Sequence, residues 1–110
     1  MILTNSGKRI KIDARKLGQF SKGIGLMFRR SRSDNLLFEF KKDVKMVIHS
    51  FFVFFPFLAI WVDSKNRVID FEIVRPFRPR VMPKKKFRKL IEVPINFKNR
   101  EIIKFFIKGN

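Results

Sequence analysis

The feature that most constrains this fold is an uncharged, apolar run at residues 46–62, in a chain whose net charge is +17. A membrane-spanning helix needs about 20 apolar residues to cross roughly 30 Å of hydrocarbon, so the run is at the short end of that range. Pro56 lies inside it, and a proline within a helix removes a hydrogen bond and clashes with the preceding turn. The run is therefore predicted to form two buried β-strands, at residues 46–55 and 57–62, and no transmembrane span is expected.

The rest of the chain has the alternation and turn signals of a β protein. Further strands are predicted at residues 8–12, 35–40, 68–74, 89–93 and 102–107. A short helical turn is expected at residues 13–18, where an aspartate can cap it, and residues 63–67 are predicted to close a hairpin. Short strands separated by turns predict an all-β fold, a compact antiparallel β-sandwich or small β-barrel that forms a single domain over residues 1–110.

Composition narrows the classes of function. The chain has fifteen Phe and one Trp to fill a core, and it has no Cys, which excludes disulfides and thiolate metal sites. Its only histidine, His49, cannot form a histidine metal cluster by itself, and no cofactor is expected. No apolar stretch of signal-peptide length begins the chain, so the expected location is the cytoplasm.

Short motifs across the middle of the chain resemble those of a known family. They are Gly25-Leu26-Met27-Phe28-Arg29, Leu36-Leu37-Phe38-Glu39-Phe40, Ile48-His49-Ser50-Phe51-Phe52-Val53, Phe55-Pro56, Ile60-Trp61-Val62-Asp63, Val68, Arg75-Pro76-Phe77 and Ile91-Glu92-Val93-Pro94. Their order and spacing over residues 20–96 resemble domain-of-unknown-function family 192, also called uncharacterised protein family 0127, especially its archaeal branch. The resemblance implies a compact β-barrel or β-sandwich and no agreed activity.

The chain departs from the family pattern at two places. Leu58 stands where the family usually has an aspartate, two residues after Pro56, and Ile95-Asn96-Phe97 follows Pro94 where a glycine is expected. If that aspartate contributes to a ligand site in relatives, this chain lacks it.

The most distinctive predicted surface is a basic, proline-stiffened loop at residues 75–89. Its cations, with no acid among them, are Arg75, Arg78, Arg80, Lys84, Lys85, Lys86, Arg88 and Lys89. Pro76, Pro79 and Pro83 oppose regular structure and hold the loop extended, which lowers the cost of ordering it along a phosphate backbone. With a sequence pI near 11.3, the loop favours binding of nucleic acid or another polyanion.

Phe77 and Phe87, within this loop, are candidate faces on which unpaired bases stack. The alternative is a solvated connection whose two rings lie in the core. A second hypothesis is a protein-binding or homo-oligomeric module that uses exposed strand edges or aromatic surface. A third is binding of the basic loop to anionic membrane headgroups.

An enzyme has less support than these binding roles. His49 lies in an apolar strand, where a histidine is more often a hydrogen-bonded core or rim residue than a base. His49, Asp63 and Glu92 form a lower-ranked hypothesis for a small-ligand site, because nothing in the sequence brings them together. No catalytic residues are assigned.

Overall fold

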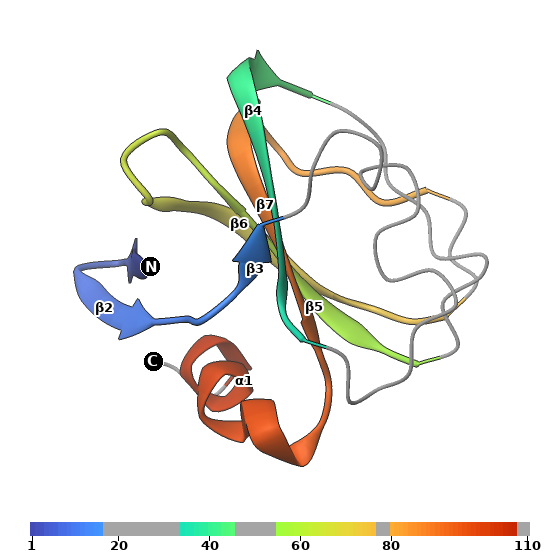
Figure 1. Cartoon of the computed structure of the whole chain (residues 1–110). Helices are drawn as coiled ribbons and strands as arrows, with labels where there is room; N and C mark the ends of the chain where they lie inside the picture. The colour runs from blue at the N-terminus through green and yellow to red at the C-terminus, as the bar shows by residue number, and fades with distance from the viewer. Residues whose placement is uncertain (17–33, 46–54, 77–79, 108–110) are drawn as a thin grey trace.

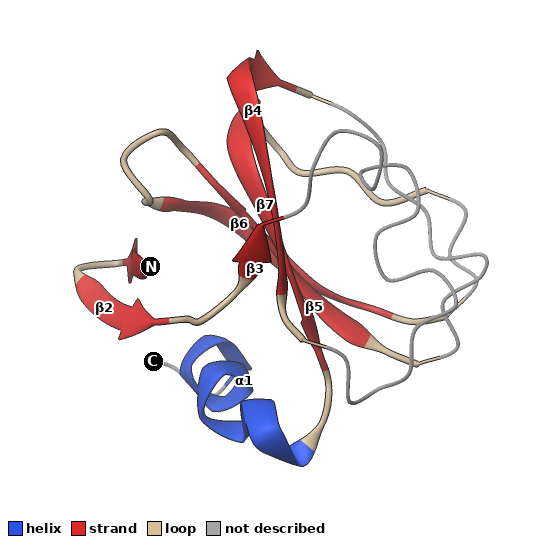
Figure 2. Cartoon of the chain, viewed as in Figure 1, coloured by secondary structure: helices blue, strands red, loops and turns tan. Residues whose placement is uncertain are grey.

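The structure is a computed structural model that describes residues 1–16, 34–45, 55–76 and 80–107 (Figure 1). Its centre is a five-stranded sheet in the order β3-β4-β7-β5-β6, and a separate ribbon pairs β1 with β2. The elements are β1 (Ile2–Asn5), β2 (Lys8–Lys11), β3 (Arg15–Lys16), β4 (Leu36–Val44), β5 (Phe57–Val62), β6 (Val68–Val74), β7 (Phe87–Pro94), the 3-10 turn η2 (Phe97–Asn99) and α1 (Arg100–Ile107). The ribbon and α1 lie on the same side of the sheet (Figure 2).

The strand β5 is buried on both faces, as predicted for a continuous apolar run. Its side chains alternate between two clusters because successive strand residues point to opposite faces. One cluster, beneath the ribbon and α1, holds Leu3, Ile12, Leu58, Ile60, Val62, Ile91, Val93 and Phe106. The other, on the opposite face, holds Leu36, Phe38, Phe55, Phe57, Ala59, Trp61, Val74, Val81, Phe87 and Leu90. The strand predicted at residues 57–62 is therefore confirmed, whereas most of its predicted partner at residues 46–55 lies outside the described residues.

The predicted hairpin is confirmed as well. β5 and β6 pair antiparallel, and the backbone N–H of Asn66 donates to the carbonyl of Asp63 at 3.1 Å within the turn that joins them. The strands expected at residues 8–12, 35–40 and 89–93 correspond to β2, β4 and β7, with β4 and β7 longer than predicted.

The last predicted strand, at residues 102–107, is wrong, because these residues belong to α1. Ile102, Phe105 and Phe106 are spaced as i, i+3 and i+4, and all three pack against the same cluster beneath the helix. Asn96 caps η2 immediately before the helix, since its side chain accepts a hydrogen bond from a backbone N–H three residues on. An amphipathic helix thus forms where a short apolar run reads equally well as a strand.

The helical turn predicted at residues 13–18 is also wrong over its described part. Arg15–Lys16 form β3, which pairs parallel with Leu36 and Leu37 of β4. The sheet is therefore mixed rather than purely antiparallel. The side chain of Asn35 donates to the carbonyl of Asp13 at 3.0 Å, which fixes the backbone that enters β3.

The β-rich character of the fold is confirmed. The described strands form an open sheet with β3 and β6 at its edges, rather than a closed barrel. In the described part of the chain, no helix combines the length and the apolar character needed to cross a membrane.

Candidate functional site

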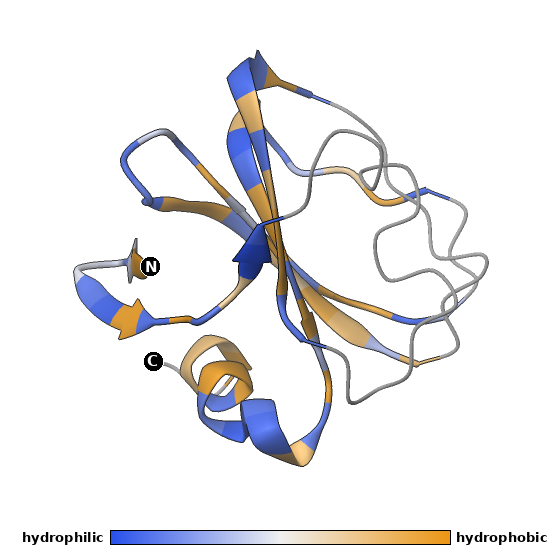
Figure 3. Cartoon of the chain, in the orientation of Figure 1, coloured by the Kyte–Doolittle hydropathy of each residue, from blue (hydrophilic) through white to orange (hydrophobic). Residues whose placement is uncertain are grey.

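Two basic runs that are distant in the sequence meet at one end of the five-stranded sheet. Val44 of β4 pairs with Phe87 of β7, and the register between these strands shifts between Glu39 and Val44. Hydrophilic residues accordingly gather near the end of β4 and the start of β7 (Figure 3). We call this surface the basic rim; its cations are Lys41, Lys42, Lys45, Lys84, Lys85, Lys86 and Arg88.

The backbone of the rim is held in place while its six lysines stay exposed. Asp70 on β6 accepts a hydrogen bond at Oδ2 from the backbone N–H of Lys84, at 3.1 Å. Asp43 is the one acid between Lys41 and Lys45, and its Oδ1 accepts a hydrogen bond from Nε of Arg88 at 3.1 Å. Asp43 therefore offsets Arg88, and the lysines supply the rim's net positive charge.

Arg75, the first cation of the predicted loop, lies far from the rim. It follows Val74, the last residue of β6, which pairs with Phe57 of β5. Phe57 in turn pairs with Pro94 of β7, so Val74 and Pro94 lie at the same end of the sheet. Pro94 ends β7, seven residues after Phe87, which corresponds to roughly 23 Å at about 3.3 Å per strand residue. Arg75 is thus at the opposite end of the sheet.

Three other cations predicted for the loop are not assigned to the rim. Lys89 donates from Nζ to Oδ1 of Asn66 at 2.7 Å and so reaches toward the β5–β6 turn. Arg80 is exposed, and Arg78 lies outside the described residues. The rim therefore takes only the C-terminal part of the predicted loop and adds the lysines of β4.

The proposed stacking role is contradicted for Phe87. Its side chain is fully buried, and its ring packs edge-on against Phe40 with centroids 5.7 Å apart. It is a core residue, as in the alternative interpretation of the loop, and presents no face to a base. Phe77 lies outside the described residues.

Two residues of the predicted ligand site are apart. Glu92 is buried in the middle of β7 and is level with Ala59 of β5. Asp63 follows the end of β5, four residues beyond Ala59, or roughly 13 Å along the strand at about 3.3 Å per residue. His49 lies outside the described residues. The structure thus gives no support to a joint site for Asp63 and Glu92.

Asp63 is a turn residue, and its hydrogen bonds explain its electrostatics. Its Oδ1 accepts the backbone N–H groups of Lys65 and Arg67, each at 2.9 Å, and its Oδ2 accepts Nε of Arg67 at 2.8 Å. Partial burial raises the pKa of this carboxyl, but the hydrogen bonds and the charge of Arg67 outweigh that effect and hold the pKa below its ordinary value of 3.8. Its role is to close the hairpin.

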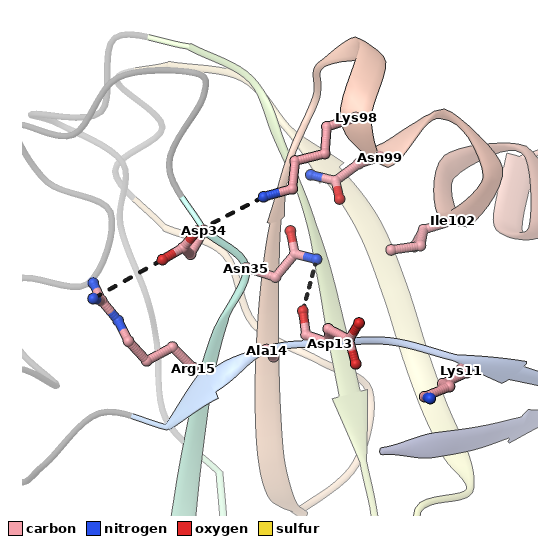
Figure 4. Close-up of a pocket in the computed structure, with 9 residues that line it drawn as sticks. All are labelled: Lys11, Asp13, Ala14, Arg15, Asp34, Asn35, Lys98, Asn99 and Ile102. Carbon is pink, nitrogen blue, oxygen red and sulfur yellow. Dashed lines mark hydrogen bonds and ion pairs between the residues drawn. The ribbon is translucent and has the colours of Figure 1, made fainter.

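A polar pocket of about 480 Å³ lies apart from the rim, between the connection from β2 to β3, the start of β4 and the beginning of the C-terminal helical segment (Figure 4). Its polar side chains include Lys11, Asp13, Arg15, Asp34, Asn35 and Lys98. Asp34 lies between two cations, 3.9 Å from Arg15 and 3.8 Å from Lys98. The pocket therefore presents both signs of charge.

Neither the lysines of β4 nor the pocket was predicted as a site. The lysines in residues 41–45 are evident in the sequence. That they lie beside Lys84–Lys86 depends on the register between β4 and β7, which the sequence does not show. The pocket draws on segments that are even farther apart. No group of three or more His, Cys, Asp and Glu side chains within the described ranges is arranged to hold a metal ion.

The chain is similar to one uncharacterised protein family and to two solved structures. The model of family DUF192, described as "Uncharacterized ACR", matches residues 1–104. No protein with a curated description matches the chain. A crystal structure from Sinorhizobium meliloti, described as that of a "putative transcription regulator", has a TM-score of 0.74 at 16% identity, covering 92% of this chain and 81% of that one. A protein of unknown function from Novosphingobium aromaticivorans has a TM-score of 0.73 at 14% identity, covering 92% of this chain and 75% of that one. At these identities the two likenesses show the fold alone.

Proposed function

This chain belongs to the DUF192 family, and we propose that it binds nucleic acid through the basic rim. The observation that carries the proposal is the pairing of Val44 with Phe87, which places the lysines of β4 beside those that precede β7. Seven cations then lie close together at one end of the sheet, where the acids bonded to them are Asp43 and Asp70. Phosphate contacts by such cations release counterions from the nucleic acid, and this release supplies most of the affinity of binding that does not depend on sequence.

The charge of the whole chain acts in the same direction. A net charge of +17 creates a positive potential that attracts polyanions from a distance and speeds their association. Transcription regulation, the role suggested for the Sinorhizobium meliloti protein, is compatible with nucleic-acid binding, but the likeness to that protein conveys the fold and not its function. The rim is the surface at which we expect the attracted polyanion to bind.

The test is the salt dependence of binding to a short DNA duplex, followed by fluorescence anisotropy. If the six rim lysines each neutralise a phosphate, the slope of log affinity against log salt is about −5, from roughly 0.9 per contact. The triple variant Lys84→Gln, Lys85→Gln, Lys86→Gln is expected to flatten the slope by up to about 3. The triple variant Lys41→Gln, Lys42→Gln, Lys45→Gln is expected to flatten it equally.

A matched control separates the rim from charge in general. Arg75, Arg100 and Lys104 are exposed and follow the strand ends at the opposite end of the sheet, and replacing all three with Gln removes the same charge. This control is expected to keep most of the steep slope. No measurable binding at about 50 mM salt, where such attraction is favoured, would refute the proposal. Equal loss in all three triple variants would show that binding has no defined site.

A further inference from the structure

The pocket in Figure 4 is lined by Asn35, whose side-chain oxygen is a buried hydrogen-bond acceptor. Asn35, which directly precedes β4, is 8% exposed and lines the pocket. Its Nδ2 donates to the carbonyl of Asp13 at 3.0 Å. Because a carbonyl only accepts, this bond fixes the orientation of the amide and turns Oδ1 away from Asp13. Oδ1 is buried and accepts no hydrogen bond from any residue that the structure describes.

A buried acceptor of this kind calls for a donor. Buried polar side-chain atoms in folded proteins nearly always have a hydrogen-bond partner, because leaving one without a partner costs free energy. An N–H or O–H group that enters the pocket can supply it. Oδ1 of Asn35 therefore selects ligands that carry such a group.

The exposed side chains of the pocket include two cations that can bind an anion. Lys98 and Arg15 are more than half exposed, and their contacts with Asp34, at 3.8 Å and 3.9 Å, are long for ion pairs. Exposed pairs of this length hold their partners weakly, so the cationic groups can turn to an incoming anion. Both come from elements that flank Asn35, Arg15 from β3 and Lys98 from η2 (Figure 4).

We propose that this pocket binds a small carboxylate that carries an adjacent ammonium or hydroxyl group, as an α-amino acid or α-hydroxy acid does. The carboxylate contacts Lys98 and Arg15, and the neighbouring donor bonds to Oδ1 of Asn35. A carboxylate suits the lining better than a phosphate dianion because Asp13 and Asp34 also face the pocket and repel higher charge. This site is separate from the basic rim and does not depend on the function proposed for it.

The test is titration of the ¹⁵N-labelled protein with glycine and with lactate, followed by the backbone amide signals of residues 34–35 and 98–99. Acetate, which has the carboxylate without the donor, and inorganic phosphate serve as comparators. Glycine and lactate are expected to give saturable shifts below about 10 mM, and acetate to bind at least about tenfold more weakly. No saturable shift with either ligand overturns the proposal, as does acetate or phosphate binding as tightly as lactate.

Variants test the two halves of the recognition. Lys98→Gln changes a side chain that is 71% exposed and whose ion pair with Asp34 is 3.8 Å long. This variant is expected to fold and to weaken lactate binding about tenfold. Lys104→Gln, an exposed lysine on α1 outside the pocket, is the matched control and is expected to change nothing. Asn35→Ala is expected to abolish the preference for lactate over acetate. Unchanged binding in Lys98→Gln overturns the proposal even if Asn35→Ala does not fold.

Discussion

Replacement of Asp63 with alanine should weaken the hairpin between β5 and β6 and, through it, the β1–β2 ribbon. Three hydrogen bonds end on the Asp63 carboxylate, from two backbone N–H groups and from Nε of Arg67. The same turn contacts the ribbon, because the carbonyl of Asn66 accepts the backbone N–H of Thr4 at 3.0 Å. Loss of the carboxylate therefore loosens two elements of the fold.

The expected loss follows from the contacts. A side chain that caps backbone N–H groups contributes about 0.5–2 kcal/mol, by analogy with the first turn of a helix. A partly exposed ion pair such as that with Arg67 adds about 0.2–1 kcal/mol, and the Asp63 side chain is 27% exposed. Asp63→Ala should thus lower the free energy of unfolding by about 2 kcal/mol. Asp63→Asn keeps an acceptor at Oδ1 and should cost about 1 kcal/mol.

The difference between the wild type and Asp63→Asn should depend on pH. The folded-state pKa of Asp63 is lowered below 3.8, so the folded protein holds the charged carboxylate more tightly than the unfolded chain does. This stabilisation is fully present above the unfolded-state pKa and is lost as the pH falls through the lower folded-state pKa. The gap in stability between the two proteins should therefore close in acid.

Urea unfolding at neutral pH and at a series of acid pH values measures this gap, and hydrogen exchange at β1 and β2 reports the loosened ribbon. Asp34→Asn is the control, because its ion pairs are 3.8 Å and 3.9 Å long and its side chain is 55% exposed. It should change the free energy of unfolding by less than about 0.5 kcal/mol. A gap between wild type and Asp63→Asn that stays constant into acid would refute the reasoning, as would an Asp63→Ala variant no less stable than Asp34→Asn.

Two other predictions concern the helix and the rim. Phe106→Ala should lower the free energy of unfolding, measured in urea, by about 3–5 kcal/mol, because this buried ring lies 5.0 Å from the ring of Phe71. Ile107→Ala, at an exposed position of the same helix, should lower it by less than about 1 kcal/mol. Equal losses in the two variants would contradict the packing of α1 on the sheet. Asp43→Asn should strengthen duplex binding and steepen its salt slope by up to about 0.9, because it releases Arg88 from its ion pair. Weaker binding by this variant in the anisotropy assay would contradict the placement of the rim.

The sequence predicts the core strands well and the ends of the chain poorly, for physical reasons. Residues 57–62 could be assigned to a strand because Pro56 excludes a continuous helix through the apolar run. The run is apolar at every position, which indicates a strand that is buried on both faces. Residues 102–107 could not, because a run of this length satisfies both a buried strand and a short amphipathic helix. What decides in favour of the helix is tertiary: Ile102 and Phe106 find an apolar sheet face on which to pack. The cap at Asn96 was the local signal that was missed.

Only part of the basic rim could be predicted from local sequence. Composition and charge indicated a basic surface, and the run Lys84–Lys86 indicated part of its position. Its other half, Lys41 and Lys42, became a neighbour only through the pairing of β4 with β7, which is set by the packing of buried side chains on both strands. The polar pocket depends on the same kind of long-range placement, since Asn35 and Lys98 come from segments far apart in the chain. The residues proposed to bind ligands are therefore positioned by the core, and a change in the register of the core strands would disrupt the rim without altering a single charge.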